Sequence, residues 1–181
     1  MAAKSRVLFT RYPRSSVLVY NGTTMGHYLV GALGLILGYP GWVGYLLGLP
    51  YLALSLAEMY LHMPLKVCPN CVYYRLEGPL CVSGLHVISR RIARPGNVRR
   101  FSARAQGLLC PNNLYMASLF APVAAVIPSL FLHFSPVVLA ILVALLCLVL
   151  FRFFVIFPKI ACVHCRAQGV CPQAKSMGFG G

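Results

Sequence analysis

Two long apolar blocks dominate the chain, and polar segments that carry cysteines follow each of them. The blocks span residues 25–65 and 114–157, and each is about twice the ~20 residues that a helix needs to cross the hydrocarbon core of a bilayer. Pro40 and Gly41 interrupt the first block near its middle, and Pro136 closes a similar break in the second. The pattern predicts two helical hairpins, with helices over 24–39, 42–63, 114–132 and 136–157.

Composition agrees with a membrane location. The chain has 181 residues, of which 59% are hydrophobic and 10% charged, whereas soluble domains carry about 25% charged residues. We therefore expect an all-α integral membrane protein with four transmembrane helices in two hairpins. Its expected parts are a basic N-terminal segment (1–24) with a short strand-like run at Ser16–Tyr20, hairpin 1 (25–65), a cysteine-rich basic loop (66–113), hairpin 2 (114–157) and a cysteine-rich tail (158–181).

The charges fall on one side of this plan. The chain has sixteen Lys and Arg but only two acidic residues, Glu58 and Glu77, so its formal charge is +14. The basic residues lie in the N-terminal segment, the loop, the tail or, for Arg152, near the tail end of the last helix, and the two turns carry none. Cytoplasmic loops are enriched in Lys and Arg, so we expect both termini and the cysteine-bearing segments on the cytoplasmic side. Several tyrosines near this interface suggest an aromatic belt: Tyr20, Tyr28, Tyr60, Tyr73, Tyr74 and Tyr115.

The same charge pattern indicates the partners. The basic residues flank apolar segments, which favours contact with anionic lipids and with acidic cytoplasmic faces of other subunits in a membrane complex. Nucleic acid, the other common partner of a basic chain, is not expected.

The two hairpins are followed by similar cysteine modules. In each module a CxxC pair begins four residues after a proline: Cys68 and Cys71 follow Pro64, and Cys162 and Cys165 follow Pro158. A third cysteine comes later in each, at Cys81 and Cys171. The pattern suggests a tandem repeat whose halves are related by a pseudo-two-fold axis along the membrane normal, with both CxxC pairs at one depth.

Cysteine spacing makes metal binding the leading chemistry. Disulfides are rare in the cytoplasm, so CxxC pairs there favour metal ligation, and a lone cysteine in the last helix, Cys147, is interpreted as a packing residue. Iron–sulfur clusters are the expected cofactor, since three of the cysteines precede a proline as in ferredoxin-type runs and the spacings are irregular; zinc is the alternative. The candidate ligands are Cys68, Cys71, Cys81, Cys110, Cys162, Cys165 and Cys171.

Two partitions of these ligands are open. In the favoured one, the four cysteines up to Cys110 hold one cluster, and the three of the tail hold a second that His164 or a partner completes. In the other, the two CxxC pairs share one metal and the remaining cysteines are left over.

Polar residues within the apolar blocks are the other candidates. Glu58 and His62 are four residues apart, so they share one helix face, and an intramembrane carboxylate is a functional candidate by default. The pair could pass protons to a quinone or bind a ligand; the plainer interpretation is a hydrogen bond between them, or pairing of Glu58 with Lys66. His27 is expected at similar depth. Haem or pigment ligation by His27 and His62 is the disfavoured interpretation.

The functional expectation follows from what the chain lacks. It has no nucleophile constellation and no phosphate loop, and two acidic residues offer little for acid–base catalysis. We expect a membrane-anchor or electron-transfer subunit of a larger redox complex that is not catalytic alone. The alternatives are a zinc-stabilised structural accessory subunit and a membrane thiol–disulfide or metal-handling protein.

Overall fold

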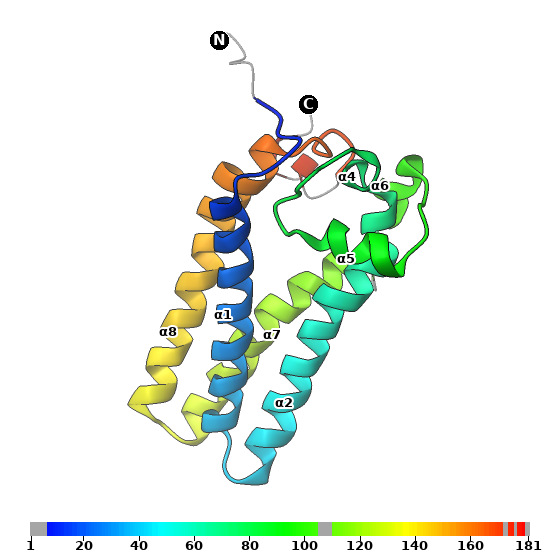
Figure 1. Ribbon diagram of the computed structural model, residues 1–181. Helices are drawn as coiled ribbons and strands as arrows, with labels where there is room; N and C mark the ends of the chain where they lie inside the picture. Colours follow the sequence, from blue (N-terminus) through cyan, green and yellow to red (C-terminus); the bar gives the residue numbers. More distant parts are fainter. Residues whose placement is uncertain (1–6, 105–109, 172–173, 176, 180–181) are drawn as a thin grey trace.

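The computed structural model describes residues 7–104, 110–171, 174–175 and 177–179, and no β-strand occurs among them. The all-helical character predicted from the sequence is confirmed. Two pairs of long helices are joined by short turns at the two predicted breaks (Figure 1). These are α1 (Arg14–Gly38) with α2 (Trp42–Ala57), and α7 (Pro111–Leu132) with α8 (Pro136–Phe151).

Two of the long helices continue with π-helical geometry. After α2 come a π-helical segment, η1 (Glu58–His62), and α3 (Met63–Lys66). After α8 comes a longer π-helical segment, η4 (Arg152–Ala161). The first segment ends two residues before Pro64 and the second contains Pro158, and proline cannot donate the usual backbone hydrogen bond. Widened turns of this kind often occur at functional sites.

The short elements gather at one end of the bundle, opposite the two turns (Figure 1). The segment before α1 lies at this end too, since the Phe9 backbone N–H donates to the carbonyl of His164 at 2.9 Å. Both cysteine modules are therefore at the same end of the molecule. The short elements are η2 (Cys68–Asn70), α4 (Val72–Arg75), α5 (Leu85–Ile92), η3 (Val98–Arg100), α6 (Phe101–Arg104) and η5 (Cys162–His164).

Helix α1 begins ten residues earlier than the sequence predicted. The strand-like run Ser16–Tyr20 is helical, so that expectation was wrong. The reason is that the buried face of α1 continues toward its start at helical spacing: Thr24, His27 and Gly31 are buried, and Val17 is half-buried on the same face. The polar residues of this first part hid the periodicity.

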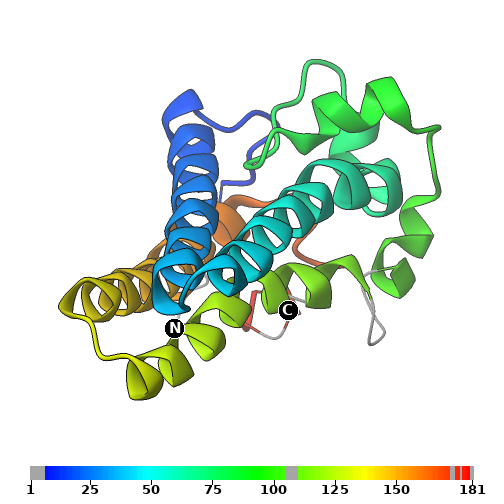
Figure 2. The ribbon, with the colours of Figure 1, turned by 90° about the horizontal axis from the view of Figure 1, so that it is seen from below.

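Helix α1 is the centre of the bundle and contacts α2, α7 and α8. Its closest approach is to α2, where a Cβ added at Gly48 would lie 2.8 Å from the carbonyl oxygen of Ala32. By contrast, α2 and α7 lean away from α1 and α8 toward α5 and α6 (Figures 1 and 2), and they contact each other at few positions.

Three helical stretches of the described chain are long and apolar enough to cross a membrane: Trp42–Asn70, Pro111–Leu132 and Pro136–His164. Their outward faces are strongly apolar; Leu54 is 70% exposed and Phe131 is 86% exposed. Apolar surface of this extent cannot face water at low cost, so these helices indicate an integral membrane protein.

Candidate functional site: a cysteine-lined cavity

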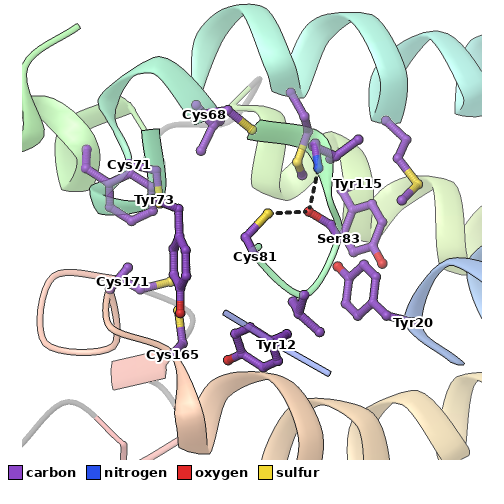
Figure 3. Close-up of a pocket in the computed structure, with 17 residues that line it drawn as sticks. Tyr12, Tyr20, Cys68, Cys71, Tyr73, Cys81, Ser83, Tyr115, Cys165 and Cys171 are labelled. Carbon is purple, nitrogen blue, oxygen red and sulfur yellow. Dashed lines mark hydrogen bonds between the residues drawn. The ribbon is translucent and has the colours of Figure 1, made fainter. Parts of the chain in front are cut away.

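Five cysteines from both modules surround one cavity at the end of the bundle (Figure 3). The cavity has a volume of about 180 Å³, far more than the 10–15 Å³ that a single water-sized probe occupies. Most of its remaining wall is aromatic or aliphatic, with Tyr12, Tyr73 and Tyr115 among the lining residues. We call this space the cysteine cavity; its thiols are those of Cys68, Cys71, Cys81, Cys165 and Cys171.

The two CxxC pairs have nearly the same local conformation. The first cysteine of each pair starts a 3₁₀ turn (η2 or η5), and the second is extended. The Cys71 N–H donates to the carbonyl of Cys68 at 3.0 Å, and the Cys165 N–H donates to that of Cys162 at 3.2 Å. This shared turn lets Cys71 and Cys165, which are far apart in sequence, approach the same cavity.

The segment before α1 holds the two modules together. The Tyr12 N–H donates to the Leu80 carbonyl of the first module at 2.8 Å, and the Tyr12 hydroxyl donates to the Ala161 carbonyl before the second at 2.5 Å. The Tyr73 hydroxyl donates to the Phe9 carbonyl at 2.6 Å. The sequence analysis gave this segment no role, although Phe9 and Tyr12 stand out as aromatic residues in a basic stretch.

Tyr73 and Tyr115 do not belong to a lipid-facing belt. Both are buried and both line the cysteine cavity. Figure 3 shows the Tyr73 side chain among the cysteines and Tyr115 near Tyr20. The belt interpretation fails for these residues because depth along the bundle, which sequence gives, does not reveal which way a side chain points.

Burial controls the chemistry of two cavity thiols. Removal from water, together with the charge of neighbouring cysteines, raises the pKa of the Cys71 thiol to about 12 and of the Cys165 thiol to about 11. These thiols are therefore neutral at physiological pH, and a metal that binds them must displace their protons.

Cys81 differs because it has a histidine partner. Its Sγ lies 3.1 Å from His86 Nδ1, and His86 Nε2–H donates to the Pro79 carbonyl at 3.0 Å. Burial acts to raise the pKa of the Cys81 thiol, but the hydrogen bond and charge of His86 outweigh it, and the net pKa is lowered. The sequence analysis missed His86, since a cysteine and a histidine five residues apart match no common metal or thiol motif.

Arg152 lies directly behind the cavity wall and is 1% exposed. Its guanidinium donates to the hydroxyls of Tyr115 and Thr24 and lies 5.2 Å from the ring centroid of Tyr20. Tyr20 and Tyr115 also line the cysteine cavity. Among the described residues, this buried charge contacts hydroxyls and aromatic rings and forms no ion pair with a carboxylate.

The other predicted cysteines lie away from the cavity wall. Cys110 is buried at the start of α7, where its Sγ accepts a hydrogen bond from the Asn113 N–H at 3.3 Å. Cys162 packs against the apolar core. Cys147, which the sequence analysis interpreted as a packing residue and not as a ligand, is exposed on α8 and does not pack inside the bundle. His164 stacks on Phe9 and bonds to the Val7 carbonyl. This grouping differs from the favoured partition because it combines the two modules and sets Cys110 apart. It differs from the other partition because Cys81 and Cys171 line the cavity and Cys162 does not.

The polar residues of the apolar blocks fall into two places. His62 Nδ1 lies 2.6 Å from Glu58 Oε2, so the pair predicted from the spacing is present. His27 is buried and its Nε2–H donates to the Leu119 carbonyl at 2.9 Å, which ties α1 to α7.

Within the described residues, no three His, Cys, Asp or Glu side chains are grouped so that they could hold one metal ion as they stand. The thiols are instead distributed around the wall of the cysteine cavity. Comparisons with models of protein families, with curated proteins and with solved structures found no match to this chain.

Proposed function

We propose that this protein is a membrane-anchor and electron-transfer subunit of a larger redox complex, and that the cysteine cavity holds an iron–sulfur cluster. The observation that carries the proposal is the distribution of five thiols around one space of about 180 Å³. In a cluster, different thiolates bind different iron atoms, so ligands spread over a wall suit it. A zinc ion requires four ligands about 2.3 Å from a single point.

Charge balance supports an anionic group in the cavity. Thiolate-bound clusters carry negative charge, and a buried cation without a counter-charge is costly. Arg152 supplies the positive charge immediately behind Tyr20 and Tyr115. Neither acidic side chain is a partner of Arg152 among the described residues, because Glu58 pairs with His62 and Glu77 is exposed on the loop.

We extend the membrane assignment to four spans. Helix α1 has a more polar composition than the three apolar stretches, but it contacts all of their long helices. On its outward side Leu29, Leu33 and Leu37 are exposed, and this apolar stripe suits contact with lipid. The repeat is also retained as a proposal, supported by the shared order of π-helical segment, proline and 3₁₀ CxxC turn in both halves.

The cysteine end is proposed to face the cytoplasm, where its basic residues meet anionic lipids and an acidic partner subunit. A polar cleft of about 280 Å³ at this end supports the lipid contact, because Lys66, Arg94 and Arg100 line it together with Asn70 and Asn97.

Single cysteine variants test the cluster. The full chain, purified without oxygen, would be compared with Cys71→Ser, Cys165→Ser and Cys147→Ser by visible absorption and by electron paramagnetic resonance after reduction. We expect both cavity variants to lose or alter the signal and Cys147→Ser to retain it. Unchanged spectra in both cavity variants would rule out the cysteine cavity as the cluster site, and a colourless wild type that holds zinc would favour the structural alternative.

A second candidate, thiol–disulfide chemistry, is favoured by the Cys81–His86 contact. A thiol with a lowered pKa among other thiols is the usual arrangement for disulfide exchange. This candidate predicts a metal-free, colourless protein in which Cys81 forms a reversible disulfide with another cavity cysteine.

A further inference from the structure

A second cleft lies between α2 and α7, where these helices diverge. It has a volume of about 340 Å³ and lies within the candidate spans, and pockets of this size accommodate small organic ligands. Its walls are mainly apolar, with Leu54, Leu114 and Ala121 among them. Glu58 also lines it, and we call it the Glu58 cleft.

One oxygen of Glu58 lacks a hydrogen-bond partner. Its side chain is only 10% exposed, and Oε2 is bonded to His62 Nδ1 at 2.6 Å. Oε1 is buried and, within the described part of the chain, has no hydrogen-bond partner. An unsatisfied buried carboxylate oxygen is costly, so a ligand that donates a hydrogen bond to Oε1 would be strongly favoured.

The Glu58 cleft and the cysteine cavity share a wall. Adjacent residues of η1 line the two spaces, Glu58 the cleft and Met59 the cavity. Adjacent residues of α7 do the same, Leu114 lining the cleft and Tyr115 the cavity. Only η1 and α7 therefore lie between the Glu58 cleft and the cysteine cavity.

We propose that the Glu58 cleft binds a membrane-soluble hydroquinone, with one ring hydroxyl donating to Glu58 Oε1. The apolar walls suit an aromatic ring and its tail, and the orphan oxygen suits a hydroxyl donor. A carrier that loses protons and electrons together also needs a proton exit, which the Glu58–His62 contact provides toward the His62 ring, which is 33% exposed.

Transfer of electrons from the hydroquinone rests on the proposed function, because it needs the iron–sulfur cluster. Binding of the hydroquinone in the Glu58 cleft does not. Oxidation of one hydroquinone breaks two O–H bonds and leaves the quinone, two protons and two electrons. Glu58 and His62 would take up the protons in turn, and an iron–sulfur cluster held by the thiols of the cysteine cavity would accept the two electrons one at a time. Binding can therefore be measured on metal-free protein.

The test is equilibrium binding of a decyl-substituted benzohydroquinone to the metal-free full chain in nanodiscs. Calorimetry under nitrogen measures the affinity. The matched probe is its dimethyl ether, which has the same ring and tail but no hydroxyl donor. We expect the ether to bind at least ~10-fold more weakly, in line with the ~1.4 kcal/mol that corresponds to a tenfold change. Glu58→Gln should weaken hydroquinone binding and narrow the difference between the two probes.

Ala117→Phe fills the Glu58 cleft without changing the Glu58–His62 pair, and Ala140→Phe makes the same change on the exposed face of α8. Loss of binding in the first variant with retention in the second supports the proposal. Equal affinity for the ether, or undiminished binding in Ala117→Phe, overturns it, and tighter binding of a diacylglycerol would assign the cleft to lipid. Iron analysis of the same preparation tests the proposed function separately.

Discussion

Individual side chains at the end of the bundle differ in chemistry although many of them are the same residue type. Cys71 and Cys165 are made unreactive by burial, while Cys81 is activated by His86. Sequence could supply the residue types and the CxxC spacing. It could not supply this difference, because the His86 contact and the burial of each thiol depend on how the segment after α4 folds over the bundle.

Alkylation rates should follow this difference. In the metal-free reduced protein at pH 7, we expect iodoacetamide to modify Cys81 at least ~100-fold faster than Cys71 or Cys165, because only the thiolate reacts and its population falls tenfold per unit of pKa. Peptide mass spectrometry over time measures the three rates. His86→Gln should slow the alkylation of Cys81 and leave the alkylation rates of Cys71 and Cys165 unchanged. Equal rates at the three cysteines would contradict the activation of Cys81 by His86.

The raised pKa values also predict how stability depends on pH. Cysteines in the unfolded chain ionise near pH 8.5, whereas Cys71 and Cys165 in the folded chain keep their protons to about pH 12 and 11. Above pH 8.5 the folded state thus binds more protons than the unfolded state, so the free energy of unfolding falls as pH rises.

Thermal unfolding of the metal-free protein between pH 8 and 10 checks this expectation. The midpoint should fall across that range, and the fall should be smaller in the double variant Cys71→Ser/Cys165→Ser. A midpoint that is constant or rises with pH would show that these thiols are not buried.

At the scale of elements, the apolar blocks predicted the long helices and their breaks because a membrane leaves few choices for a long apolar segment. The start of α1 was missed because polar residues at 14–16 and 21–23 flank the short apolar run 17–20. The place of this segment in the bundle depends on contacts far along the chain, such as the bond from Asn21 to the Ser83 carbonyl. The sequence offered the meeting of Cys71 with Cys165 only as one of two alternatives. It could not select between them, since the bond from Tyr12 to Ala161 that helps to join the modules connects residues 149 positions apart.

The α1–α2 contact gives a prediction at this scale. An added methyl at Gly48 would press on the Ala32 backbone, which cannot move as a flexible side chain can, whereas nothing lies within 4 Å of an added Cβ at Gly26. We expect Gly48→Ala to lower the free energy of unfolding by ~1–3 kcal/mol. Gly26→Ala should leave it unchanged or raise it slightly. Equal effects in thermal unfolding of the two variants would contradict the close packing of α1 on α2.

For the whole molecule, the charge pattern and the gathering of both modules at one end make a single prediction about orientation. In intact cells, a membrane-impermeant maleimide should label His133→Cys, in the turn between α7 and α8, and should not label Glu77→Cys at the cysteine end. Permeabilised cells should label both. The reverse pattern would put the native thiols in an oxidising compartment and favour disulfide chemistry over metal binding.

The central claim is that cysteines of two distant modules jointly hold an iron–sulfur cluster, and the most direct measurement is the iron and acid-labile sulfide content of the full chain purified without oxygen. We expect iron and sulfide in equal molar amounts, a broad visible absorption band, and loss of both elements when either Cys71 or Cys165 is replaced by serine. Zinc without sulfide, or iron and sulfide that survive both replacements, would contradict a shared cluster.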